Sequence, residues 1–176
     1  RFLNKNSTLT LDYYATIFVN QVVIDYEEEG SLSFYNLEGK SSAKSLQVKL
    51  DISLTPQLEF ISAYKNDIVS IDYRSGRKQK QLVPKNRFFT NLSWNSIKNI
   101  KNQQWKYDFT INGIGSQRMV KNSSNPNFNQ SPSFSLINTQ LTRVFSDFSE
   151  IYIGIENLGN FTQKNPIIFD NEPFNN

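Results

Sequence analysis

Hydrophobic and polar residues alternate along most of this chain with a period of two. Between residues 46 and 54 every even position is apolar and every odd position is polar. Residues 105–112 repeat the pattern with aromatic side chains on the apolar side, and residues 8–17 place Leu9, Leu11, Tyr13, Ala15 and Ile17 on one side. Strict alternation predicts β-strands with one apolar and one polar face.

Four further segments have the same character with less regular alternation. They are residues 58–69, 88–97 and 134–145, and the segment in which Ile151, Ile153 and Ile155 share a face. No segment shows a helical period. The sequence therefore predicts an all-β, antiparallel chain with about seven strands.

The links between these strands alternate in length. Thr55-Pro56, residues 98–102 and residues 146–149 are short, whereas residues 20–42, 73–85, 117–133 and 162–176 are long and polar. Outer-membrane barrels have this order, with short periplasmic turns and long extracellular loops. The link pattern favours an up-and-down β-barrel.

Strand length agrees with a transmembrane barrel, because a tilted membrane strand needs about 9–11 residues whereas soluble strands average about 5–6. Alternation then directs apolar residues to lipid and polar residues to the lumen. The lumen candidates are Lys49, Asp51, Lys106 and Asp108, and the candidates for aromatic girdles are Tyr13, Tyr64, Trp94 and Trp105. A soluble antiparallel sandwich also alternates and is the alternative fold.

Composition excludes several functions. The net charge of +3 is too small to indicate a nucleic-acid partner, and the absence of Cys and His excludes disulfides, thiol chemistry and imidazole-based catalysis or metal binding. Aromatic residues make up 14% of a chain whose mean hydropathy is −0.52, which suits alternating strands. No apolar run reaches the roughly 20 residues of a spanning helix, and no leader peptide is recognisable, so we expect one to have been cleaved or to lie upstream.

The segment 151–168 carries the most specific motif. An aromatic and glycine strand, with Tyr152 and Gly154, runs into Glu156-Asn157-Leu158, then Phe161, then Gln163-Lys164-Asn165-Pro166-Ile167-Ile168. This resembles the penultimate barrel strand and following loop of TonB-dependent outer-membrane receptors of the Bacteroidetes type. Four other segments resemble that family in the same order: residues 11–24, residues 34–40, residues 82–89, and Gly115-Ser-Gln-Arg118-Met with the Ser-Ser-Asn-Pro of residues 123–126.

The resemblance implies that residues 1–176 are part of the C-terminal β-barrel domain of such a receptor, in a barrel of about 22 strands. The plug, the early strands and the last strand have no counterpart here. The family imports scarce nutrients across the bacterial outer membrane: siderophores, metal chelates, cobalamin, glycans or peptides. The implied partners are the TonB energy complex acting through the plug, the remainder of the receptor, and outer-membrane lipid and lipopolysaccharide. Neither a cofactor nor an enzymatic activity is implied, and nucleic acid is not expected.

Two other candidates come from the long links. Arg74, Arg77, Lys78 and Lys80 form a basic cluster, which with Arg118 is a candidate for anionic substrate or lipopolysaccharide phosphate, or for plain solvated charge. The acidic run at residues 27–29 is a candidate cation site or a solvated loop tip. Glu156 is a candidate lumen carboxylate or a structural residue. A soluble β-sandwich binding module and a passive porin-like channel remain alternative functions.

Overall fold

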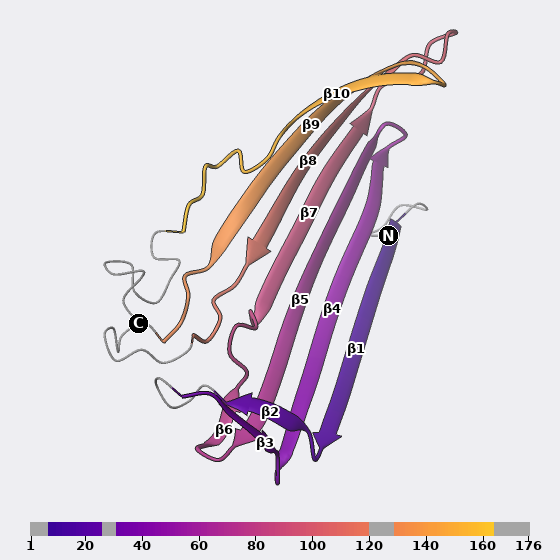
Figure 1. Ribbon diagram of the computed structural model, residues 1–176. Helices are drawn as coiled ribbons and strands as arrows, with labels where there is room; N and C mark the ends of the chain where they lie inside the picture. The colour runs from indigo at the N-terminus through magenta and orange to yellow at the C-terminus, as the bar shows by residue number, and fades with distance from the viewer. Residues whose placement is uncertain (1–6, 26–30, 120–128, 164–176) are drawn as a thin grey trace.

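The computed structural model describes residues 7–25, 31–119 and 129–163, and the fold is all-β (Figure 1). Ten strands follow one another: β1 (Ser7–Val19), β2 (Val22–Asp25), β3 (Ser33–Asn36), β4 (Lys40–Thr55), β5 (Leu58–Tyr73), β6 (Gly76–Gln79), β7 (Asn86–Asn95), β8 (Gln104–Ile114), β9 (Phe134–Ser146) and β10 (Ser149–Ile155). The prediction of an all-β, antiparallel chain is confirmed.

Seven strands form one continuous sheet in the order β1-β4-β5-β7-β8-β9-β10, and every pairing is antiparallel. β6 pairs with the far end of β5, and β2 and β3 form a separate hairpin. Among the described residues β1 pairs only with β4 and β10 only with β9, so the described sheet is open at both edges.

Short and long connections alternate as the sequence predicts. β4–β5 and β9–β10 are joined by two residues each, and residues 96–103 join β7 to β8. The predicted long polar links differ from the structure in one respect, because two of them contain the short strands β2, β3 and β6. Strands of four residues are too short for alternation to identify them.

The pleat of the seven-strand sheet separates its side chains into two faces, because paired residues point to the same side and successive residues to opposite sides. The apolar face carries Leu9, Leu11, Tyr13, Leu46, Val48, Leu50, Phe60, Tyr64, Phe88, Leu92, Trp94, Tyr107, Phe109, Ile111, Ile137, Leu141, Ile151 and Ile153. The polar face carries Asp12, Gln47, Lys49, Asp51, Lys65, Asp67, Arg87, Asn91, Lys106, Asp108, Thr110, Asn138, Gln140 and Glu150.

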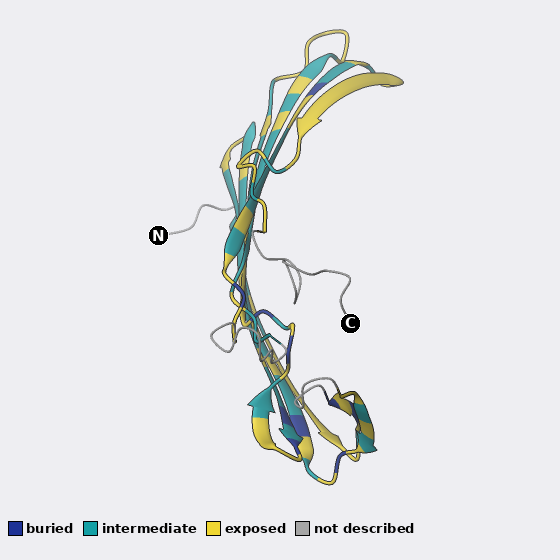
Figure 2. Ribbon diagram, turned by 60° about the vertical axis from the view of Figure 1, so that its left-hand side comes forward, coloured by how far each residue is buried: buried dark blue, intermediate teal, exposed yellow. Residues whose placement is uncertain are grey.

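The sheet is a curved single layer along most of its length (Figure 2). Fully buried hydrophobic residues among those described occur only at the end where β2, β3 and β6 lie: Val23, Leu37, Ile71 and Tyr73, with Tyr35 packed against them. We call these five residues the hairpin core. Ile71 and Tyr73 belong to the polar face by register, so the hairpin core lies on that side of the sheet. The apolar face has no second layer against it within the described residues.

Candidate functional site: a groove on the polar face

The lumen candidates in the strands all lie on the polar face. Lys49 pairs with Asp51 at 3.0 Å, and Lys106 pairs with Glu150 of the neighbouring strand at 3.7 Å. Asp108 lies two residues after Lys106 on β8, on the same face, and it is opposite Ser93 and Gln140. These ion pairs are partly exposed, and such pairs contribute little to stability. The two ion pairs are not brought together, because β5 and β7 lie between β4 and β8.

The basic cluster of the long link is held by local contacts. The Arg74 guanidinium lies 4.1 Å from the centroid of the Tyr35 ring, Arg77 pairs with Asp72 at 3.3 Å, and Lys78 donates to the Ser75 hydroxyl at 2.8 Å. Arg118 donates from Nη1 to the Gln79 carbonyl at 3.0 Å. The structure gives each of these candidates a part in folding the links. The acidic run at residues 27–29 lies outside the described residues.

The C-terminal motif also has a structural part. Glu156 directly follows β10 and is exposed. Asn157 has a φ of 50°. Its side-chain Nδ2 donates to the Phe161 carbonyl, and its side-chain Oδ1 accepts from the Phe161 N–H, both at 2.9 Å. The N–H of Leu158 donates to the Ile137 carbonyl at 2.7 Å. Gln163 is exposed, and Lys164, Asn165 and Pro166 lie outside the described residues.

The turn around Asn157 returns the chain over the sheet. Phe161 stacks on Phe134 of β9, with ring centroids 4.6 Å apart and an angle of 5° between the rings. Phe134 shares the polar face with Ile114, its register partner on β8. The motif thus positions an aromatic pair at the long-link end of the polar face, where Ile114 and Leu136 also lie.

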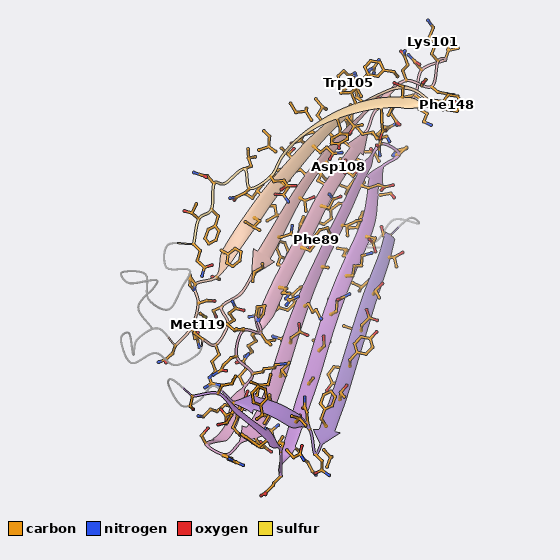
Figure 3. All side chains as sticks on the ribbon, viewed as in Figure 1. Phe89, Lys101, Trp105, Asp108, Met119 and Phe148 are labelled. Carbon is orange, nitrogen blue, oxygen red and sulfur yellow. The ribbon has the colours of Figure 1, made fainter. Side chains whose placement is uncertain are left out.

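Phe134 borders a groove of about 700 Å³, which we call the polar-face groove. Its polar lining consists of Gln47, Lys65, Arg87, Asn112 and Gln117, and its apolar lining includes Ala63, Leu82, Pro84, Phe89, Ile114, Phe134 and Leu136. Phe89 is visible near the middle of the sheet in Figure 3. Among the described residues, two cations and no carboxylate line the groove, and the sequence patterns predict neither Lys65 nor Arg87 as a site residue.

The rim of the groove is built by two links that bind each other. The N–H of Leu82 donates to the Arg118 carbonyl at 2.9 Å, and Pro84 forms an isolated antiparallel bridge with Gln117. Gly115 allows this approach, since a Cβ atom there would lie 2.8 Å from the Asn86 carbonyl oxygen. Leu82 has a φ of 57°, an unusual conformation for a bulky apolar residue. Such backbone strain costs about 1–3 kcal/mol and is typical of functional positions.

The hairpin core contains the one titratable group with a clearly shifted pKa among those described. Burial raises the pKa of Tyr35 above 10.0, and its hydrogen bond to Asp25 Oδ2 at 2.7 Å acts in the same direction. The neutral phenol donates this bond, so the hairpin is built around a protonated tyrosine.

Other kinds of site are not seen. No three carboxylates of the described residues gather as metal ligands would. A helix able to cross the membrane is likewise not found in the described part of the chain. Comparisons with protein-family models, with curated proteins and with solved structures found no match for this chain.

Proposed function

We propose that this chain is a wall segment of a transmembrane β-barrel in the bacterial outer membrane, and that the barrel belongs to a TonB-dependent nutrient importer. The observation that carries the barrel is the one-sided sheet. Its strands place most apolar side chains on one face and most ionised side chains on the other, and among the described residues nothing is packed on the apolar face. Lipid is the solvent that favours such a face.

The distribution of charged residues on the apolar face also favours lipid as its solvent. Within the described strands the ionised residues of the apolar side all lie outside residues 46–54 of β4 and the positions opposite them: Lys40, Lys44, Asp72, Arg77 and Arg143. Residues 46–54 span about 27 Å at about 3.4 Å per residue, or about 20 Å in height at a tilt of about 40°. This is close to the apolar band of about 25 Å of known outer-membrane barrels.

Aromatic residues lie at both limits of this band. Tyr13 lies next to the row of Lys44, and Trp94 and Trp105 lie near the short turns, whereas Tyr64 is opposite Val48 inside the band. The guanidinium of Arg143 lies 4.9 Å from the centroid of the Trp105 ring. Trp and Tyr favour the membrane–water interface, and an Arg side chain reaches the headgroups while its stem stays on apolar surface.

The open edges agree with a larger sheet. Backbone groups in lipid must all be paired, which requires a closed barrel. Additional strands next to β1 and β10 would provide the closure, and the rest of the receptor would supply them. The importer itself rests on the sequence resemblance, and in that proposal the chain forms lumen lining and solute-recognising loops, with no enzymatic chemistry.

The barrel is tested with single-cysteine variants, for which a chain without Cys is a clean background. We expect bimane on Val48→Cys or Leu50→Cys to be quenched by brominated lipid in outer-membrane vesicles, and bimane on the neighbouring Gln47→Cys or Lys49→Cys to be spared. Equal quenching at both pairs would overturn the barrel wall, and a monodisperse protein without detergent would favour the soluble sandwich.

The importer is tested by energy dependence. We expect deletion of the gene to create a requirement for a scarce nutrient, and uptake of that nutrient to stop when the proton gradient is collapsed. The reconstituted protein should stay nearly closed to ions. Uptake that continues without the gradient, together with steady ion conductance, would identify a passive channel instead.

A further inference from the structure

We propose that Lys65 and Arg87 bind the anionic group of a small solute whose apolar body lies against the aromatic side of the polar-face groove. The two residues are direct cross-strand partners in the register of β5 and β7, and both line the groove. As a site for imported solute this inference rests on the proposed function, whereas anion binding can be tested without it.

The pairing of like charges is the first observation. Residues directly opposite each other on antiparallel strands have Cβ atoms about 4.5–5.5 Å apart, and like charges in that position destabilise the sheet. The other charged residues of the polar face avoid it: Lys49 is opposite Thr10 and Ala63, and Lys106 is opposite Asn95 and Thr142. An anion held between Lys65 and Arg87 would remove the repulsion.

The available carboxylate does not neutralise the pair. Asp67 lies 3.4 Å from Lys65 Nζ, but it is displaced along β5 toward the long links and does not line the groove. Lys49 and Asp51 form the same i, i+2 arrangement on the adjacent strand at 3.0 Å, with no second cation opposite. The other carboxylate of this row is Asp12, which lies opposite Gln47 and two strands away from Lys65. The cross-strand partners of Arg87 are Lys65 and Ile114, so no carboxylate of the described residues is opposite Arg87.

The rest of the lining defines the ligand class. Gln47, Asn112 and Gln117 supply amide groups around the cations, and Phe89, Phe134 and Leu136 supply an apolar wall. Phe134 is fixed by its stack with Phe161. The volume of about 700 Å³ lies in the range of small-molecule sites. The lining fits a carboxylate on an aromatic or aliphatic body better than a bare inorganic ion.

The test is a lysine footprint on the intact protein in detergent, read by peptide mass spectrometry. The probe is benzoate and its neutral isostere is benzamide, at constant ionic strength. At a benzoate concentration of about twice its Kd, acetylation of Lys65 should slow about threefold, because the free-site fraction falls to about one third. Lys49 is the matched control and should react at an unchanged rate, and benzamide should protect neither lysine.

Variants separate the charge from the apolar wall. Arg87→Gln should abolish protection of Lys65, Arg87→Lys should retain part of it, and Phe134→Ala should weaken protection by benzoate more than protection by acetate. Protection that survives Arg87→Gln, or that is equal at Lys49 and Lys65, would overturn the proposal. So would a Lys65 that is already unreactive before ligand is added, since another part of the protein would then occupy the groove.

Failure here is distinguishable from failure of the barrel. The lipid-quenching pattern at Val48 and Gln47 reports on the solvent of the two faces and does not depend on Arg87. Retained quenching with no protection of Lys65 would remove only the anion site. Protection of Lys65 without lipid quenching would keep the anion site and remove its part in transport.

Discussion

The two ends of β5 have different surroundings, although one continuous strand connects them. At the end toward Tyr73, Ile71 on the polar face is packed against the β2–β3 hairpin and is only 6% exposed. Toward Leu58, the apolar residues of the same strand lie on a single layer with no cover in the described part of the chain (Figure 2).

In the proposed barrel, this difference corresponds to two solvents. The hairpin core hides apolar side chains from water by packing them against each other, as a water-soluble domain does. The long apolar face does not, and its alternation is instead suited to lipid on one side and water on the other. The same kind of substitution should therefore have consequences of different size in the two regions.

Truncation in the hairpin core should have the largest effect. Leu37 is 1% exposed, and Leu37→Ala should destabilise the hairpin by about 2–5 kcal/mol through lost burial and the cavity left behind. Faster hydrogen exchange in residues 22–25 and 33–36, with unchanged exchange in β8 and β9, would measure it. Leu50→Ala on the apolar face in lipid is the matched control and should cost less, since lipid refills the space. Equal losses would contradict two solvents.

A charge placed on the apolar face should come next. Val48→Lys is expected to cost about 2–4 kcal/mol in a bilayer, because the ammonium would lie near the middle of the hydrocarbon band. Gln47→Lys adds the same group to the polar face one residue away and should be almost neutral. Denaturant unfolding in lipid vesicles measures both. Similar losses in the two variants would contradict a lipid-facing apolar side.

Asn157 should give a smaller, local loss. Its side chain both donates to and accepts from the backbone of Phe161, so Asn157→Ala leaves partly buried groups unpaired and should cost about 2 kcal/mol. Exchange of the Leu158 and Phe161 amides should accelerate. Asn160→Ala controls for the left-handed backbone, because Asn160 has a φ of 47°. If both variants behave alike, backbone conformation and not the Asn157 side chain holds the turn.

The fold followed from the sequence where it depended on local patterns. Alternation is a property of the pleat, so residues 46–54 and 105–112 revealed which side chains share a face, and the candidates Lys49, Asp51, Lys106 and Asp108 lie on the polar face as expected. Whether that face lines a lumen remains a prediction.

The groove could not be predicted from the sequence, because it depends on the pairing register of β5 and β7. These strands are not joined by a tight turn, and the sequence contains no direct signal for their register. Lys65 and Arg87 are brought together across a link that contains β6 and the left-handed residue Leu82. No local sequence rule predicts how many residues separate β5 from β7, and this number sets which residues of the two strands are paired. The buried hairpin was missed for a related reason, since four-residue strands carry too little alternation to be separated from a polar link.

The smallest effect concerns pH and again separates the two regions. The pKa of Tyr35 is raised above 10.0 by burial and by the bond to Asp25, so the neutral phenol is favoured more in the folded hairpin than in the unfolded chain. Its stabilising contribution is present in full below pH 10.0 and is lost as the pH rises through the folded pKa.

Tyr35→Phe measures this contribution directly. It should remove from the spectrum a tyrosinate signal that titrates above pH 10.0. It should also destabilise the hairpin by about 1–2 kcal/mol at neutral pH, because the phenol loses the bond it donates to Asp25 and the bond it accepts from the Arg74 N–H. Hydrogen exchange of residues 22–25 in the parent protein should then accelerate at alkaline pH beyond the rise expected from base catalysis, while β8 keeps its protection. If the tyrosinate signal that disappears in Tyr35→Phe titrates below pH 10.0 in the parent protein, Tyr35 is not held in the hairpin core. The hairpin would then no longer differ from the apolar face as a water-excluding core.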